Sequence, residues 1–269
     1  MIKKQLKKIY RFFFVKEHTP DELFEIRLLQ NKLLKEFKKE ENFYIATTLN
    51  LLIAIRKETH SDYLVFQQIF NFKEYKTVLS IFNNNFYKKE QCVVIDAGAN
   101  VGYTSLYFLD QIPNVKIFGI EPSSENMAFY RKNISLNNYN NQVVFYENAL
   151  ADAENKSFIL DNSFGDGKDW AIATLESQNG TIQGITIHEI IKNNLLQKIS
   201  ILKIDIEGAE RFIFNNNSDL SFLEITEIIA IEIHDEYEVR SQIYKILKNF
   251  GFILIESGEL TIGLNKKYL

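Results

Sequence analysis

The chain has 269 residues, of which 46% are hydrophobic and 25% charged, and its formal net charge is -4. This composition is typical of a globular protein that buries a core, and it excludes a disordered chain. The net charge is weakly negative and produces no positive electrostatic potential that would attract a polyanion. Nucleic acid is therefore not an expected partner. The single cysteine, Cys92, excludes an internal disulfide and a cysteine-based metal cluster, and it favours a cytoplasmic location.

The first residues, MIKKQLKKIYRFFFV, combine lysines with apolar residues at helical spacing. The apolar run after Arg11 is too short for a signal peptide, and no window holds the ~18 apolar residues of a membrane span. We expect an amphipathic helix that docks on its own domain. Contact with an anionic membrane surface is the alternative.

Up to about residue 90 the apolar spacing predicts helices, over residues 21–40, 46–55 and 63–82. Pro20, followed by two acidic residues, marks the start of one of them, because proline and acids suit the first turn of a helix. The sequence therefore predicts a helical N-terminal extension over residues 1–90, acting as a substrate cap or an oligomer contact. It makes no prediction of the oligomeric state.

From Cys92 onward, short runs rich in isoleucine and valine alternate with helix-length segments. The runs are VVIDA, VKIFGIE, QVVFYENAL, ISILKID and EIIAIEIH, followed by GFILIE and LTIGLN. Continuous apolar strands separated by helices predict a largely parallel sheet covered on both faces. The last two runs, with Gly258 between them, predict an antiparallel hairpin. We therefore expect one α/β domain over residues 91–269.

The first strand runs into the turn GANVG, at the edge of the sheet where α/β proteins bind ligands. Gly102 is followed by Tyr103 and Thr104, which excludes the Gly-Lys-Ser/Thr ending of a phosphate loop. Asn100 and Tyr103 also stand where a dinucleotide fingerprint needs glycine. Asn100 is one of the few non-glycine residue types that tolerate a positive φ.

What remains is Asp96-x-Gly98-x-Asn100-x-Gly102, a variant of the acid-plus-glycine turn that holds S-adenosylmethionine in Rossmann-like methyltransferases. An acid at the end of the second strand, Glu121, is placed to accept hydrogen bonds from two ribose hydroxyls.

The third strand ends in YENALAD, where we expect the adenine. The main chain at Asn148 and Ala149 and the side chain of Leu150 are the candidate contacts. An ordinary exit from a strand explains this segment equally well.

The fourth and fifth strands end in acids. Asp205 closes the fourth strand, which in such a sheet lies beside the first, so Asp205 faces the reactive end of the cofactor. Glu207 follows in the first turn of a helix, where the helix dipole and Arg211 provide a purely structural alternative. Glu232 and His234 lie on one face at the end of the fifth strand, and both need partners if buried. A hydrogen-bonded strand end without a chemical role is the alternative for His234.

The sequence resembles the FkbM family of S-adenosylmethionine-dependent methyltransferases. The segments that carry the resemblance are, in this order, DAGANVG, IEPSSENMAFYRKNISLN, NALAD, LKIDIEGAE and EIHDE. The resemblance runs from about Tyr63 to the end of the chain. It implies a Rossmann-like fold with a seven-stranded sheet, S-adenosylmethionine as cofactor, and methyl transfer, commonly to a hydroxyl of a sugar or natural product.

The resemblance also implies roles for individual residues. The implied cofactor-binding residues are Asp96, Gly98, Asn100, Gly102, Thr104, Glu121, Asn148, Ala149, Leu150 and Asp205. Asp205 and Glu207 lie at the reactive crevice. The sequence departs from the family pattern at one place before the fourth strand. The family usually shows Thr-Leu-Asp there, and this sequence has Thr186-Ile187-His188. Any role of the family's aspartate therefore does not carry over to this chain.

Methyl transfer from a sulfonium mainly requires alignment of the reacting atoms, and an alcohol acceptor must also lose its proton. We expect Asp205 or His234 to take that proton, with Glu207 beside them. No metal is expected, and a divalent ion held by Asp205, Glu207, Glu232 and His234 is a secondary hypothesis.

The acceptor is expected to be a small molecule or a glycan. Trp170 and Phe164 either stack on a sugar or pack within the protein. Methylation of nucleic acid is disfavoured. Methylation at cytosine C5 needs a nucleophilic thiol, and Cys92 precedes the first strand, away from the carboxyl edge. Enzymes that methylate the adenine amine carry Asn/Asp-Pro-Pro-Tyr after the fourth strand, where this sequence reads Asp-Ile-Glu-Gly. The alternative functions are an NAD-type oxidoreductase on a similar sheet and a catalytically silent relative that binds cofactor.

Overall fold

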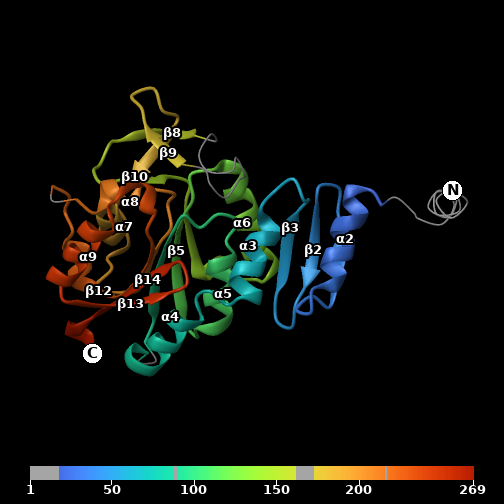
Figure 1. The fold of residues 1–269 in the computed structure, drawn as a ribbon, viewed down its shortest axis with the longest axis horizontal. Helices are drawn as coiled ribbons and strands as arrows, with labels where there is room; N and C mark the ends of the chain where they lie inside the picture. Colours follow the sequence, from blue (N-terminus) through green and yellow to red (C-terminus); the bar gives the residue numbers. More distant parts are fainter. Residues whose placement is uncertain (1–17, 88–89, 162–172, 216) are drawn as a thin grey trace, which may run out of the picture.

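The computed structural model describes residues 18–87, 90–161, 173–215 and 217–269 (Figure 1). The predicted N-terminal amphipathic helix lies outside these ranges, as do Trp170 and Phe164. Within them, no helix is long and apolar enough to cross a membrane.

The centre of the molecule is a seven-stranded sheet with the order β13-β14-β12-β11-β4-β5-β6. Its strands are β4 (Cys92–Ala97), β5 (Val115–Ile120), β6 (Val143–Tyr146), β11 (Ile199–Ile204), β12 (Thr226–Glu232), β13 (Phe252–Ser257) and β14 (Leu260–Asn265). The five strands from β12 to β6 are parallel, and β14 runs antiparallel to them. The edge strand β13 pairs antiparallel with β14 and therefore runs in the same direction as the five. This is the predicted Rossmann-like sheet with a C-terminal hairpin. Its fourth long strand, β11, lies beside β4 as expected.

Helices cover both faces of this sheet (Figure 1). One face packs against α5 (Tyr103–Gln111) and α6 (Ser124–Leu136), and the other against α7 (Ile187–Asn194), α8 (Glu210–Ile213) and α9 (Arg240–Asn249). The short helical turns among these elements are η3 (Asn140–Gln142), η4 (Ser221–Ile225), η5 (Asp235–Tyr237) and η6 (Lys266–Tyr268). Strands buried on both faces explain the unbroken apolar runs of the sequence.

The N-terminal part contains the predicted helices only in part. Its helical elements are α2 (Pro20–Gln30), α3 (Asp62–Phe66), η1 (Gln67–Asn71), α4 (Lys76–Ile81) and η2 (Phe82–Phe86). The helix start predicted at Pro20 is confirmed. Thr19 caps this helix, and its hydroxyl accepts a hydrogen bond from the backbone N–H of Glu22.

The prediction of helices over 31–40 and 46–55 is wrong. These residues form a three-stranded antiparallel sheet of β1 (Glu36–Lys39), β2 (Phe43–Thr47) and β3 (Leu52–Arg56). The exposure of β2 alternates along the strand, with Tyr44 and Ala46 buried. Periodicity cannot distinguish a short apolar run in a strand from one in a helix, which explains the error over β3.

Side chains of α5 and α6 in the α/β domain occupy the outer edge of β3. The backbone N–H of Leu52 donates to Asn137 Oδ1, and the Leu52 carbonyl oxygen accepts from Asn137 Nδ2. The Ala54 N–H donates to Asn133 Oδ1, and the Ala54 C=O accepts from the Tyr103 hydroxyl. The small sheet is therefore attached to α5 and α6 by hydrogen bonds like those of a neighbouring strand, and its apolar residues belong to the same core as α5 and α6.

A second small sheet has the order β7-β10-β8-β9 and projects from the top of the molecule in Figure 1. Its strands are β7 (Ala149–Leu150), β8 (Ser157–Asp161), β9 (Ala173–Glu176) and β10 (Ile182–Ile185). Because β7 directly follows β6, this sheet continues the chain from the edge where the cofactor is expected.

Candidate active site

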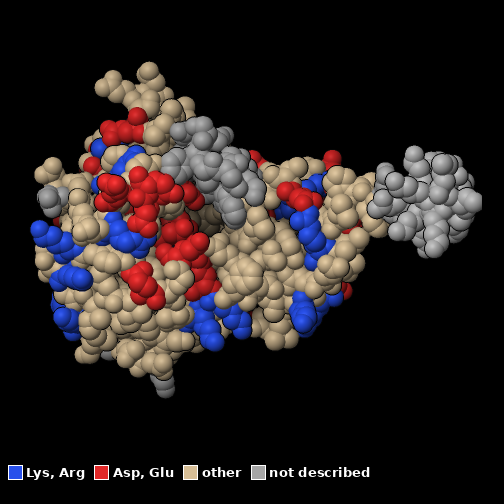
Figure 2. All heavy atoms as spheres, viewed as in Figure 1, with Lys and Arg blue, Asp and Glu red and all other residues tan. Residues whose placement is uncertain are grey.

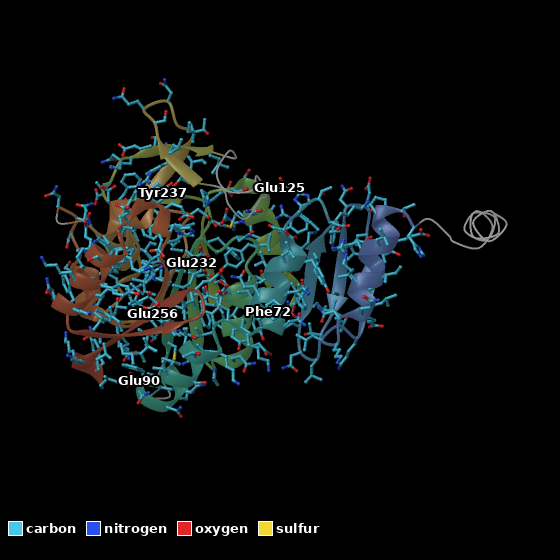
Figure 3. All side chains as sticks on the ribbon, in the orientation of Figure 1. Phe72, Glu90, Glu125, Glu232, Tyr237 and Glu256 are labelled. Carbon is cyan, nitrogen blue, oxygen red and sulfur yellow. The ribbon has the colours of Figure 1, made fainter. Side chains whose placement is uncertain are left out.

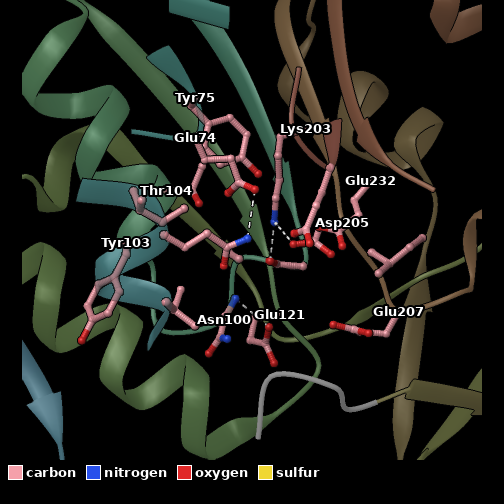
Figure 4. Close-up of a pocket in the computed structure, with 18 of the residues that line it drawn as sticks. Glu74, Tyr75, Asn100, Tyr103, Thr104, Glu121, Lys203, Asp205, Glu207 and Glu232 are labelled. Carbon is pink, nitrogen blue, oxygen red and sulfur yellow. Dashed lines mark hydrogen bonds and ion pairs between the residues drawn. The ribbon is translucent and has the colours of Figure 1, made fainter. Parts of the chain in front are cut away.

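A pocket of about 940 Å³ opens at the carboxyl ends of β4, β5, β11 and β12 (Figure 4). Residues of α3, η1 and α4 line one side of it, and the turn between β13 and β14 lines another. The predicted site residues that line it are Gly98, Asn100, Thr104, Glu121, Ala149, Leu150, Asp205, Glu207, Glu232 and His234. Three predicted cofactor contacts, Asp96, Gly102 and Asn148, do not line it.

The turn after β4 has three residues in left-handed conformations, with φ of 76° at Gly98, 51° at Asn100 and 82° at Gly102. A Cβ at Gly98 would overlap the carbonyl oxygen of Asp205, and one at Gly102 would overlap the ring of Tyr130. The two glycines therefore have different jobs. Gly98 keeps the pocket floor thin, whereas Gly102 makes room for the packing of α6 against α5.

Asp96 lies beneath the pocket rather than in it. Its side chain is fully buried and accepts a 2.6 Å hydrogen bond from the Ser105 hydroxyl. Its other oxygen lies 3.3 Å from Nζ of Lys203. Asp96 acts on the cofactor turn from below, and the prediction that it contacts the cofactor does not match this position.

Lys203 is a site residue that sequence reasoning missed. It is the one charged residue within β11, it is 2% exposed, and its Nζ donates to the carbonyl oxygens of Ala97 (3.2 Å) and Gly98 (2.6 Å). Nζ also lies 3.6 Å from Asp205 Oδ2 (Figure 4). Burial alone would lower the pKa of Lys203, but Asp96 and Asp205 outweigh burial and raise it. A lysine inside an otherwise apolar strand was the available signal.

Glu121 is 5% exposed, so it is not a solvent-facing acid. Its carboxylate accepts from the backbone N–H groups of Asn100 (2.8 Å) and Ser123 (2.9 Å) and from Asn126 Nδ2 (3.4 Å). Burial raises the pKa of Glu121, and these hydrogen bonds act against that rise. A carboxylate fixed at the end of β5 beside the glycine turn is placed to hold two vicinal hydroxyls.

The segment after β6 meets the pocket at Ala149 and Leu150. The Asn148 side chain points elsewhere, since its Nδ2 donates to the carbonyl oxygen of Gln183 in β10. Asp152, at the end of the same segment, pairs with Lys156 at 2.8 Å. The two pocket residues remain candidates for an adenine contact.

Asp205 and Glu207 follow β11, and their side chains are 30% and 23% exposed. Glu207 is not in a helical turn, because its φ is 51° and α8 begins only at Glu210. This left-handed residue turns the Glu207 carboxylate towards His234, whose Nε2 lies 3.3 Å away. Burial raises the pKa of Glu207, and the contact with His234 lowers it.

His234 lies between two carboxylates, because its Nδ1 is also 3.3 Å from the buried Glu210. Burial alone would lower the pKa of His234, but the ion pairs with Glu207 and Glu210 outweigh burial and raise it to about 11. The imidazole is therefore protonated at neutral pH. It positions Glu207 as a cation, and it has no free lone pair with which to act as the predicted base.

Glu232 lies within the reach of a second group of acids, Glu74 and Glu259, whose carboxylate oxygens all lie within 4.8 Å of one another. Burial and the nearby Asp205 raise the pKa of Glu232 to about 9, and burial raises the pKa of Glu74 to about 7. Glu74 and Glu259 were not predicted. Glu74 lies between η1 and α4, and Glu259 lies in the turn between β13 and β14 that lines the pocket.

The four ligands of the secondary metal hypothesis do not form one cluster. Asp205, Glu207 and His234 offer atoms within 4.8 Å of one another, whereas Glu232 groups with Glu74 and Glu259. Because His234 already pairs with two carboxylates, its geometry favours an ion pair over metal coordination. His188, from the departing triplet, lies elsewhere and contacts Ser221 in η4.

Comparison with known proteins identifies the family. The family described as "Methyltransferase FkbM domain" matches residues 96–254, from the glycine turn to β13. The chain belongs to the FkbM methyltransferase family. The resemblance seen in the sequence is thereby confirmed, and the fold and family imply that S-adenosylmethionine is bound. The alternative of an NAD-type oxidoreductase is set aside.

Two curated relatives of the FkbM domain match more weakly. The 31-O-demethyl-FK506 methyltransferase FkbM of Streptomyces tacrolimicus is 24% identical over 191 residues, covering 61% of this chain and 73% of that protein. The AMB antimetabolite synthetase AmbE of Pseudomonas aeruginosa is 26% identical over 183 residues. That match covers 54% of this chain and only 8% of the synthetase.

Solved structures with a similar fold include two bacterial methyltransferases. Precorrin-6y C5,15-methyltransferase from Geobacter metallireducens has a TM-score of 0.42 and 13% identity, covering 71% of this chain and 89% of that one. A SAM-dependent methyltransferase from Agrobacterium tumefaciens has a TM-score of 0.44 and 8% identity, covering 85% and 72%. The family assignment rests on the sequence match.

Proposed function

We propose that this chain transfers the methyl group of S-adenosylmethionine to a hydroxyl of a sugar, glycan or natural product. The observation that carries the proposal is a single pocket lined by the Gly98 turn, Glu121 and Asp205. A relative named as a 31-O-demethyl-FK506 methyltransferase supports oxygen as the acceptor atom. We further propose that the protein acts in the cytoplasm, in line with its single, buried cysteine.

The residues present fit the cofactor. Gly98 lets the turn approach the backbone of Asp205 more closely than any side chain would allow, and Glu121 offers a fixed carboxylate to the ribose. Oδ1 of Asn100 lies buried in the pocket wall and has no hydrogen-bond partner among the described residues. A buried acceptor without a donor is costly, so a hydroxyl or ammonium of the ligand is the partner we expect.

When bound, the cofactor supplies a methyl group on a positively charged sulfur, a good leaving group. The protein must hold the acceptor oxygen in line with it and remove the hydroxyl proton. We assign that proton to Asp205, which is partly exposed in the pocket and lies 3.6 Å from Lys203. Lys203 stabilises the charge of Asp205 and donates to the carbonyls of the turn beside it.

The acceptor side of the pocket combines apolar and acidic groups. Phe72 and Leu64 line it and are 77% and 39% exposed, which suits the face of a sugar ring or a macrocycle. Figure 3 places Phe72 on the side of the N-terminal elements, with Glu232 nearer the C-terminal half. With Glu74, Glu232 and Glu259 also present, we propose a neutral or cationic acceptor rather than a phosphorylated one.

Calorimetry tests the proposal. Protein freed of carry-over ligand should bind S-adenosylmethionine and S-adenosylhomocysteine, and it should bind neither NAD nor NADP. Transfer of labelled methyl to hydroxyl acceptors should then fall roughly 100- to 10,000-fold in Asp205→Asn, with cofactor affinity retained. Cofactor binding without transfer to any of a broad panel of acceptors would instead favour the catalytically silent relative.

A further inference from the structure

The cofactor site extends beyond the residues that the family shares. Arg56, at the end of β3, lies outside the matched residues 96–254, yet it contacts α6 close to Glu121. We propose that Arg56 is a positioning residue for the ribose-binding carboxylate, and that the N-terminal sheet therefore completes the cofactor site. This inference rests on the proposed function, because it assumes that Glu121 holds the ribose.

Asp62 fixes the guanidinium of Arg56. Nε and Nη2 of Arg56 donate to Asp62 Oδ1 at 3.0 and 2.7 Å, and the backbone N–H of Arg56 donates to Asp62 Oδ2 at 2.8 Å. The side chains are 2% and 0% exposed. A bidentate pair of this kind gives a buried arginine one defined orientation. The remaining N–H groups of the guanidinium, on Nη1 and Nη2, therefore point in fixed directions.

Those nitrogens reach two residues in the first turn of α6. Nη2 of Arg56 donates to Asn126 Oδ1 at 2.8 Å, and Nη1 donates to Glu125 Oε1 at 3.1 Å. Glu125 marks the place in Figure 3 where α6 meets the N-terminal sheet. The tip of α6 that follows Glu121 is thus held from the side of the N-terminal part.

Asn126 passes this orientation on to Glu121. Arginine carries only donors, so Asn126 must turn its oxygen towards Arg56 and its NH₂ group away from it. That NH₂ group donates to Glu121 Oε1 at 3.4 Å. Glu121 carries only acceptors when it is ionised and favours the same orientation of the amide from the other side. Arg56 anchors the amide oxygen, and without it the NH₂ group is held only by its long 3.4 Å contact with Glu121.

If the hydrogen bonds from Arg56 through Asn126 to Glu121 position the carboxylate, their loss must weaken binding of the ribose hydroxyls. If they only stabilise the fold, their loss affects all ligands equally. The probes are S-adenosylhomocysteine and its 2′,3′-dideoxy analogue, which lacks the two hydroxyls that Glu121 would bind. The wild-type protein should prefer the complete ligand. Their ratio of Kd values measures the contribution of the ribose hydroxyls, and a general loss of stability does not change that ratio.

We expect Arg56→Met and Asn126→Ala each to weaken S-adenosylhomocysteine binding roughly tenfold, the value of one hydrogen bond to a charged group. The affinity for the dideoxy analogue should change little. The matched control is Arg27→Met, because Arg27 belongs to the same extension and pairs with the partly exposed Glu58, away from Glu121. It should leave both affinities unchanged. Asn126→Ala keeps the Arg56–Asp62 pair intact and carries the test if Arg56→Met does not fold.

The possible results are distinct. If Glu121→Gln abolishes the preference for the complete ligand while Arg56→Met and Asn126→Ala retain it, the inference is wrong and the proposed function stands. If the wild-type protein binds S-adenosylhomocysteine without any preference, the ribose role of Glu121 and the inference fall together. If it does not bind S-adenosylhomocysteine at all, the proposed function itself is wrong.

Discussion

Gly98 is the residue at which the backbone of the cofactor turn comes closest to another strand end. Its φ of 76° is left-handed, and the carbonyl of Asp205 occupies the space of a side chain. Because both obstacles are backbone features, the neighbouring chain cannot yield as a flexible side chain could.

We therefore expect Gly98→Ala to lower the free energy of unfolding by more than the ~1–2 kcal/mol that left-handed strain alone costs, and to weaken S-adenosylhomocysteine binding. The matched control is Gly251→Ala, at a φ of 86° with nothing within 4 Å of the added Cβ. It should show the strain cost only, with normal binding. Urea denaturation and calorimetry measure the two effects, and equal costs at both positions would contradict this account.

His234 and Glu232 also make the stability of the protein depend on pH. The pKa of His234 is raised from 6.5 to about 11, and that of Glu232 from 4.5 to about 9. Each folded-state pKa lies above its unfolded value, so the folded protein binds protons that the unfolded chain has lost. The stabilisation from each group is complete below its unfolded pKa and declines as pH rises towards the folded one.

The free energy of unfolding should therefore fall between pH 6.5 and pH 9, the window bounded by these two residues. Urea denaturation at the two pH values measures the change. In His234→Gln the slope should be shallower, because the imidazolium no longer contributes. A stability that rises with pH over this window would show that the two groups are not protonated as described.

At the scale of elements, the contact between β3 and α6 decides how the N-terminal sheet is held. Asn133 is fully buried and bridges two backbones, accepting from the Ala54 N–H and donating to the Val101 carbonyl in the cofactor turn, both at 2.8 Å. One side chain thus joins the extension to the turn that binds the cofactor.

Asn133→Leu should leave both backbone groups buried without partners, at about 1–3 kcal/mol for each. We expect a corresponding loss in urea denaturation and faster proteolysis within β1–β3. Asn137→Leu provides the comparison, because its bonds to Leu52 are more exposed and water replaces them. If the two variants lose equal stability, burial is not what makes Asn133 important.

The elements differ in how well the sequence predicts them. The strands β4, β5, β11, β12 and β14 are predictable, because strands buried on both faces are continuous apolar runs that end at a turn signal. β13 is largely exposed, and its prediction rests on its place beside the Gly258 turn. β1 to β3 are short and lie in a small sheet that packs on other elements, so their sequence has no distinct period. The start of α2 is predictable because Thr19, Pro20 and Glu22 form a local signal.

The site itself is predictable where topology alone brings residues together, as for Gly98, Glu121 and Asp205 at neighbouring strand ends. The partners that set their charge states are not predictable in this way. Lys203 looks like an ordinary strand residue, and Arg56 is separated from Asn126 by 70 positions. The protonated state of His234 follows from Glu207 and Glu210, which lie at the left-handed turn before α8 and at the start of α8.

At the scale of the whole molecule, the acidic groups are unevenly distributed. Figure 2 shows Asp and Glu side chains gathered around the hollow of the face in view. The acids that line the pocket are Glu74, Glu121, Asp205, Glu207, Glu232 and Glu259. They exceed the lining lysines, which are Lys73, Lys76 and Lys203. Acidic side chains thus outnumber lysines around the pocket, while the protonated Glu232 and the cationic His234 reduce the negative charge there at neutral pH.

S-adenosylmethionine carries a sulfonium charge that S-adenosylhomocysteine lacks. Raising sodium chloride from about 0.05 M to about 0.5 M should therefore weaken binding of the first more than that of the second, because salt screens the attraction of the acidic pocket. Calorimetry at both concentrations gives the two changes in Kd. Equal changes for the two ligands would mean that the pocket acids are neutralised before the cofactor arrives.

The attachment of β3 also leaves a mark in the primary sequence. The three amides that α6 turns towards the N-terminal sheet are Asn126, Asn133 and Asn137, spaced by seven and four positions along one side of the helix. Two of these amides also bond within the α/β domain, Asn126 to Glu121 and Asn133 to the Val101 carbonyl. In this chain the spacing N-x6-N-x3-N therefore marks the side of α6 that is shared between the small sheet and the pocket turn.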